Sequence, residues 1–77
     1  MAEVVLMLMM LEPDTEYDVL TKLRSLQDVT EAHFLYGPYD AYVKAKAKTT
    51  GELEKLVLDG IRSIKGVRST TTCFVAG

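Results

Sequence analysis

Cysteine, histidine and excess positive charge are all scarce in this sequence, and each shortage excludes a class of protein. Cys73 is the single cysteine, so the chain cannot form the intrachain disulfides that staple small secreted domains. The net charge is −2 at pH 7, which argues against nucleic acid or an anionic membrane as the main partner. His33 is the single histidine and has no partner at metal-ligand or triad spacing. We therefore expect no direct nucleic-acid binding and no role for His33 beyond a structural or solvated one.

Long hydrophobic runs and targeting signals are missing as well. The apolar run Val4–Leu11 has eight residues and is preceded by no basic segment, so we expect no secretory signal peptide. The same run is far too short to cross a bilayer. Together with the single cysteine, these features predict a cytoplasmic protein that does not associate with membranes.

Catalytic motifs are also lacking. The sequence shows no acid–base pair, no cluster of metal ligands and no glycine-rich loop for phosphate. Three methionines, Met7, Met9 and Met10, lie in an apolar run, where methionine usually fills a core rather than binding a soft metal. Cys73 lies in an apolar strand and is expected to be a small buried hydrophobic residue, not a nucleophile. We expect no catalytic residue, no metal and no cofactor, and hence no enzyme.

What the sequence does contain is one supersecondary unit that occurs twice, at an offset of 38 residues. The matching pairs are Val5 and Val43, Val19 and Val57, Leu20 and Leu58, Leu23 and Ile61, Leu26 and Ile64, and Val29 and Val67. The leucines and isoleucines have helical spacing, and the outer valines lie in strand-like runs. Each half reads strand–helix–strand, which predicts a single α+β domain over residues 1–77. This order is typical of a ferredoxin-like βαββαβ sandwich, with a four-stranded antiparallel sheet and both helices on one face.

Strand runs and capping residues give the expected boundaries of these elements. The strands are predicted at Val4–Leu11, Val29–Tyr36, Ala41–Lys48 and Val67–Val75. Asp14 or Thr15 is expected to cap the first helix, and Thr49 with Glu52 has the spacing of a capping box for the second. Gly66 is expected to take the left-handed position after the last turn of the second helix. Its apolar residues recur with helical spacing at Leu53, Leu56, Val57, Gly60, Ile61 and Ile64.

The first strand is apolar throughout, which predicts that both of its faces are buried. Two helices can cover only one face of a four-stranded sheet. We therefore expect the first and third strands to be central, in the order 4-1-3-2, with the open face covered by a second subunit. Lys44, Lys46 and Lys48 alternate with small residues in the third strand, and we expect them to form a solvated rim of that face.

Two short motifs resemble a known family. Gly37-x-Tyr39-Asp40 follows the second strand, and Gly66-Val67-x-x-Thr70-x-Thr72 opens the last one. In this frame they resemble the RAM domain, the C-terminal regulatory domain of the Lrp/AsnC (leucine-responsive regulatory protein) transcriptional regulators. The resemblance covers Val4 to Val75. Only three residues precede the first strand, so we expect a stand-alone RAM domain without the family's helix-turn-helix domain.

The resemblance implies a dimeric α/β barrel assembly, in which the sheets of two subunits pack face to face. Dimers of dimers and octamers follow in that family, with an amino-acid effector bound between dimers. The implied site residues are Tyr36, Gly37, Asp40, Thr70 and Thr72. A carboxylate suits the effector's ammonium group, while turn N–H groups and threonine hydroxyls suit its carboxylate. The two segments lie on different strands, so we expect neighbouring subunits to contribute to one pocket.

Alternative interpretations of the same residues remain open at this point. Gly37 and Asp40 are also typical of a tight hairpin with no ligand, and Pro38 removes one N–H donor from it. Threonines in the last strand also suit a strand for their β-propensity alone. The alternative function is a protein-interaction module that co-assembles with full-length Lrp/AsnC regulators and modulates transcription indirectly.

Overall fold

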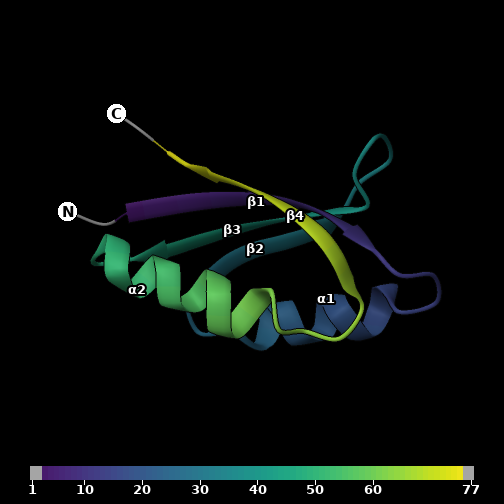
Figure 1. Ribbon diagram of the computed structural model, residues 1–77, viewed down its shortest axis with the longest axis horizontal. Helices are drawn as coiled ribbons and strands as arrows, with labels where there is room; N and C mark the ends of the chain where they lie inside the picture. The colour runs from purple at the N-terminus through teal and green to yellow at the C-terminus, as the bar shows by residue number, and fades with distance from the viewer. Residues whose placement is uncertain (1–2, 76–77) are drawn as a thin grey trace.

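The computed structural model describes residues 3–75, which form a single sheet with helices on one side (Figure 1). In chain order the elements are β1 (Glu3–Leu11), α1 (Glu16–Ser25), β2 (Val29–Phe34), β3 (Ala41–Ala47), α2 (Thr50–Lys55), η1 (Leu56–Ile61) and β4 (Val67–Phe74). The sheet order is β2-β3-β1-β4, and all neighbouring strands are antiparallel. The expected ferredoxin-like βαββαβ order with β1 and β3 central is therefore confirmed. None of the described helices is long and apolar enough to span a membrane.

The core lies between the sheet and the helices. Alternate residues of the two central strands face it, because side chains alternate across a strand. These are Val5, Met7, Met9 and Leu11 in β1, and Ala41, Val43, Ala45 and Ala47 in β3. The small side chains of β3 leave room for the helices, which contribute Val19, Leu20, Leu23, Leu53, Val57 and Ile61. Among residues 3–75, no polar or charged side chain is buried.

The other face of the sheet is open in the single chain, as is expected if a second subunit covers it. Val4, Leu8 and Met10 are half-buried on this face, and Leu6 is 37% exposed. Only the flanking strands shield these side chains, because both helices lie on the opposite side (Figure 1). We call the row Val4, Leu6, Leu8 and Met10 the open-face apolar row. Its burial by a second subunit stays a prediction.

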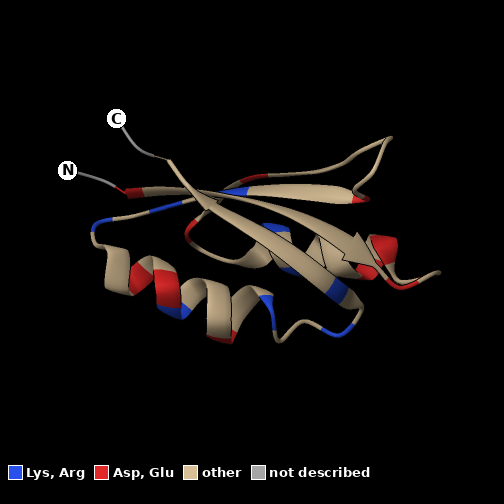
Figure 2. Ribbon diagram, turned by 45° about the horizontal axis from the view of Figure 1, so that its top comes forward, with Lys and Arg blue, Asp and Glu red and all other residues tan. Residues whose placement is uncertain are grey.

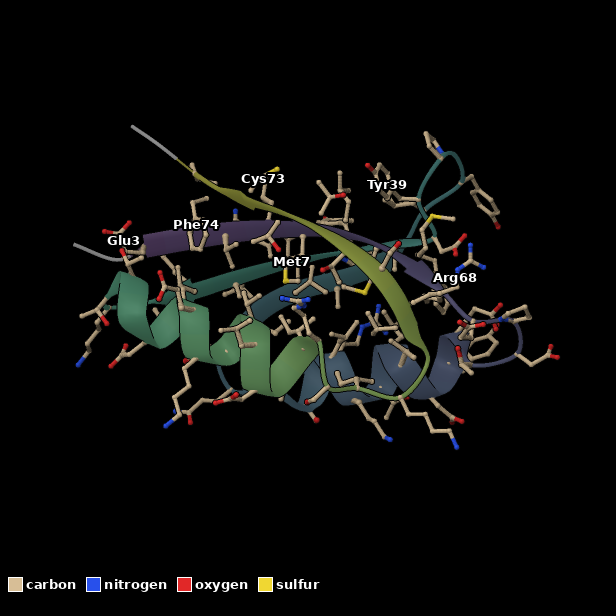
Figure 3. All side chains as sticks on the ribbon, viewed as in Figure 1. Glu3, Met7, Tyr39, Arg68, Cys73 and Phe74 are labelled. Carbon is tan, nitrogen blue, oxygen red and sulfur yellow. The ribbon has the colours of Figure 1, made fainter. Side chains whose placement is uncertain are left out.

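Cys73 also lies on the open face, where it is paired with Leu6 in the sheet. The expectation that it is buried is wrong, since its side chain is exposed. The cause is strand alternation at a sheet edge: Thr72 and Phe74 take the side of the helices, and Cys73 takes the other. Figure 3 shows Cys73 above the sheet and Met7 between the sheet and the helices.

The two helix starts differ. Thr49 is extended, with φ −134° and ψ 156°, and the Glu52 N–H donates to its hydroxyl oxygen at 3.1 Å, which confirms the expected cap. Thr15 has φ −109° and ψ −2°, and its side chain makes no capping bond to α1. Its hydroxyl instead donates to the Glu12 carbonyl at 2.6 Å. Asp14, at φ 66°, lies in the preceding turn, so the expected side-chain cap of α1 is wrong.

The second helix is not an α-helix throughout its length. At Leu56, α2 passes into the π-helical turn η1. The helix ends at Ile61, so Gly66 is not the residue that follows its last turn. Gly66 does have a positive φ of 107°, as expected, but it lies in the loop before β4. Its carbonyl accepts a hydrogen bond from the Glu12 N–H at 2.8 Å, which joins this loop to the β1–α1 turn.

Candidate ligand site at the hairpin between β2 and β3

The hairpin between β2 and β3 carries the predicted motif. Strand β2 ends at Phe34, two residues before its expected end, so Tyr36 belongs to the loop and is fully exposed. The Leu35 N–H donates to the Asp40 carbonyl at 2.9 Å and closes the loop. Gly37 has φ 149°, a conformation that side chains disfavour, which explains glycine at this position. The turn is therefore a built structure that fixes where Tyr36 and Asp40 lie.

Asp40 ties this hairpin to the end of β1. Its N–H donates to the Met9 carbonyl at 2.9 Å, and its Oδ2 accepts the Leu11 N–H at 2.8 Å. The pairing of β1 with β3 ends at Met9 and Ala41, so the carboxylate satisfies an N–H that the ladder leaves free. The interpretation of Asp40 as a hairpin residue thus has a physical basis. Within residues 3–75, its Oδ1 accepts no hydrogen bond and stays free for another donor.

Next to Asp40 lies a groove of about 550 Å³, which we call the hairpin groove. Its walls come from the end of β1, the start of α1 and the hairpin itself. The residues that matter for its chemistry are Pro13, Glu16, Tyr17, Phe34, Tyr36 and Asp40. Tyr17 and Phe34 meet edge to face, with ring centroids 5.6 Å apart and an angle of 87°. This volume lies within the range of small-molecule sites.

The predicted threonines do not line this groove. Thr70 is paired with Met9 and Thr72 with Met7, which places both on the helix side of the sheet, half-buried. Strand β1 lies between them and the hairpin. Thr70 instead borders a small polar pocket of about 140 Å³ that it shares with Arg62, Arg68 and Ser69. A role for Thr70 and Thr72 beside a neighbouring subunit's hairpin stays a prediction.

A contact between the hairpin and β4 does exist within one chain, between Tyr39 of the hairpin motif and Thr71, which was not among the predicted site residues. The Tyr39 hydroxyl lies 3.4 Å from the Thr71 Oγ1, and Figure 3 shows Tyr39 leaning from the hairpin over the sheet. Thr71 is paired with Leu8, so it faces the open side, opposite to Thr70 and Thr72. The alternation of side chains along the strand is the signal that separates Thr71 from its neighbours.

The hairpin groove is acidic. Glu16 and Asp40 are both half-buried in its lining, and no lysine, arginine or histidine lines it. Figure 2 shows acidic residues gathered at the start of α1 and in the turn before it. Sequence reasoning missed Glu16 and Tyr17, because they lie in a helix far from the motif in the sequence. Their presence gives the groove both negative charge and aromatic surface.

A second polar cluster lies on the open face and centres on Glu31. Its carboxylate accepts a hydrogen bond from the Tyr42 hydroxyl at 3.3 Å and lies 3.9 Å from the Lys44 Nζ and 3.8 Å from the His33 Nε2. Partial burial, and then the negative charge of Glu31, raise the pKa of Tyr42 above its usual value. Among the described residues, no three or more histidine, cysteine or acidic side chains gather here to hold a metal ion. It forms a polar border to the open-face apolar row.

Comparison with known proteins shows one matching family and several individual relatives. The profile of the Lrp/AsnC ligand binding domain matches residues 4–76. Regulatory protein AsnC of Escherichia coli is 34% identical over 56 residues, which cover 73% of this chain and 37% of AsnC. A homocitrate synthase from Saccharolobus islandicus is 40% identical over 57 residues, which are 74% of this chain but only 12% of that enzyme. The chain thus corresponds to little more than a third of the regulator's length.

Solved structures show the same fold. The crystal structure of FFRP-DM1 superposes with a TM-score of 0.92 at 28% identity and covers 96% of this chain and 99% of that one. A transcriptional regulator from Neisseria meningitidis in complex with L-Met superposes with a TM-score of 0.88 at 21% identity. That match covers 97% of this chain and 50% of the regulator. At this identity, the second likeness is one of fold alone.

Proposed function

Because the chain belongs to the family of Lrp/AsnC ligand binding domains, we propose that it binds a free α-amino acid in the hairpin groove. The observation that carries this proposal is the state of Asp40. One oxygen of its carboxylate is held by the Leu11 N–H, which orients the side chain, and the other oxygen is free beside the groove. An oriented carboxylate suits an ammonium group, because a charge-assisted hydrogen bond is stronger than a neutral one.

The carboxylate of the amino acid finds its donors in the turn. Within residues 3–75, the N–H groups of Tyr36, Gly37 and Tyr39 donate to no acceptor. Pro38 has no N–H, and its ring restricts the backbone angle φ at this position of the turn. Backbone N–H groups without an acceptor suit a carboxylate, whose oxygens only accept hydrogen bonds. An acceptor for the ammonium end of a zwitterion and donors for its carboxylate end therefore lie within one hairpin.

A substitution that removes the charge of Asp40 but keeps the shape of its side chain tests this proposal. Asp40→Asn keeps an oxygen for the Leu11 N–H but removes the negative charge. We expect the affinity for an amino acid to fall about tenfold to a hundredfold, the loss of a charge-assisted bond of ~1.5–3 kcal/mol. Isothermal titration calorimetry against the common amino acids measures it, with Asp59→Asn on η1 as the matched control, since Asp59 is exposed and outside the groove. Undiminished binding by Asp40→Asn would contradict the site.

We propose further that the chain forms homodimers through the open face, and dimers of dimers up to an octamer. The open-face apolar row supports this proposal, because an apolar strand in the middle of an uncovered sheet is a surface that a partner stabilises. An amino acid bound between dimers would then favour the larger assembly, and the assembly would favour binding in equal measure.

A second function follows from the length relationship. The chain matches one part of AsnC, a regulatory protein of which it covers 37%. A domain of this kind can join a full-length regulator through the surface that otherwise pairs two copies of itself. We propose this mixed assembly, with an indirect effect on transcription, as the alternative if no amino acid binds. Native mass spectrometry of the chain mixed with a purified full-length Lrp/AsnC regulator tests it, and a spectrum with only homo-oligomers would exclude it.

A further inference from the structure

The hairpin groove holds more negative charge than an ordinary zwitterion needs. Its two carboxylates, Glu16 and Asp40, come from α1 and from the hairpin, and folding brings both into the lining of one groove. Both are half-buried, and neither is paired with a lysine, arginine or histidine anywhere in residues 3–75. Asp40 can hold an α-ammonium group. Glu16 then remains without a cationic partner among residues 3–75 and is available to a second positive charge of the ligand.

The lining of the groove is also aromatic. Tyr17 is 80% exposed and Phe34 39% exposed, although their rings touch each other. Tyr36 is fully exposed on the hairpin side. Aromatic faces attract both alkyl chains and cations that lie within about 6 Å of the ring. Three exposed rings in one groove therefore suit a ligand with an alkyl stem and a positive end.

We infer that the hairpin groove selects basic α-amino acids, whose side chain carries a second positive charge. The inference rests on the proposed function, since it assigns the side chain of the same ligand. The α-ammonium group lies at Asp40, the stem crosses Tyr17 and Phe34, and the cationic end lies at Glu16. A neutral side chain leaves Glu16 unpaired, and an acidic one meets two carboxylates without a counterion.

Pairs of ligands that differ in one charge test the inference. L-Arginine and L-citrulline have nearly the same shape, and so do L-lysine and L-2-aminoheptanoic acid, but only the first member of each pair is cationic. Titration calorimetry on the wild-type chain should show about tenfold or greater preference for the cationic member, the usual size of one charge-assisted contact. Equal affinity within both pairs would overturn the inference while the proposed function stands.

Variants in the first turn of α1 assign the effect to a residue. Glu16→Gln should remove the preference for arginine over citrulline, mainly by lowering the affinity for arginine. Asp18→Asn is the matched control, because Asp18 is the other acidic residue of that turn but does not line the groove. The control should keep the full preference. A preference that survives in Glu16→Gln would overturn the assignment, and binding of no amino acid at all would overturn the proposed function as well.

Discussion

Gly66 shows how a single residue holds together segments that are distant in sequence. Its φ is 107°, and a Cβ atom there would lie 2.7 Å from both the Thr15 Oγ1 and the Val19 Cγ2. Real Cβ atoms do not approach other atoms so closely, and side chains rarely adopt this φ. The loop before β4 can therefore lie against the start of α1 only because residue 66 has no side chain. Since Glu16 is the first residue of α1, the same contact supports one wall of the hairpin groove.

Replacing Gly66 should strongly destabilise the chain. We expect Gly66→Ala to lower the free energy of unfolding by about 2 kcal/mol or more, because backbone strain and overpacking add. Urea denaturation followed by circular dichroism measures it.

Gly51→Ala is the control for this change. A Cβ at Gly51, in α2, would meet only the Thr49 Oγ1 at 3.9 Å, and alanine favours a helix by about 0.5–1 kcal/mol over glycine. It should be neutral or stabilising. Similar effects of the two substitutions would contradict the packing described for Gly66.

At the scale of elements, the two helices begin in different ways, although the sequence offers a capping residue to each. Thr49 accepts a hydrogen bond from the Glu52 N–H, and the Glu52 carboxylate accepts one from the Lys48 N–H at 3.2 Å. The Thr15 hydroxyl faces back to Glu12 instead and leaves the first turn of α1 without a side-chain cap. Stability of α2 should therefore depend on its cap.

Removing the cap of α2 tests this difference. Thr49→Ala should lower the free energy of unfolding by about 1 kcal/mol, the usual effect of losing a threonine cap. Thr50→Ala is the control, because Thr50 is the exposed first residue of α2 and alanine is a better helix former. Thermal unfolding of both variants measures the difference, and an equal loss in both would show that the cap contributes nothing specific.

The features of these elements that depend on residues close in sequence could be predicted, and those that depend on contacts between distant segments could not. The repeat at 38 residues and the alternation in Ala41–Ala47 are local patterns of apolar residues, and they predicted the element order and the core face of β3. The π-helical turn and the missing cap of α1 depend on packing between distant segments. Near Gly60 in η1, the side chain of Leu26 approaches to within 3.7 Å of where a Cβ would lie. No local pattern contains that contact.

The residues of the candidate site likewise fall into those that a local motif predicts and those that only the fold brings together. Tyr36, Gly37 and Asp40 are adjacent in sequence and form one hairpin, so a short motif was enough to find them. Glu16 and Tyr17 reach the groove only through the fold. Their signal in the sequence is an acidic and an aromatic residue side by side in the first turn of a helix, which by itself is common.

At the scale of the whole molecule, the open face is the feature that the single chain leaves incomplete. Leu6 lies in its middle, paired with Lys44 on one side and Cys73 on the other. The open-face apolar row runs along the central strand, while β2 and β3 provide the charged border around Glu31. An apolar centre with a polar rim is the usual anatomy of a protein interface. A specific interface buries about 1,000 Å² or more in total, a scale that a sheet face of this length can supply.

We therefore expect light scattering at micromolar concentration to give a mass of at least twice the 8.6 kDa of one chain. Leu6→Glu should shift this mass toward the monomer, because it places a charge in the middle of the apolar row. Leu58→Glu is the control, since Leu58 is 55% exposed on η1 and lies away from the sheet face.

Cys73 gives an independent readout: a second subunit on the open face should slow its alkylation in the wild-type chain, and Leu6→Glu should restore it. A wild-type monomer of 8.6 kDa with a freely reactive Cys73 would contradict assembly through this face. If Leu6→Glu changed neither the mass of the dimer nor the reactivity of its Cys73 thiol, the interface would lie on another surface.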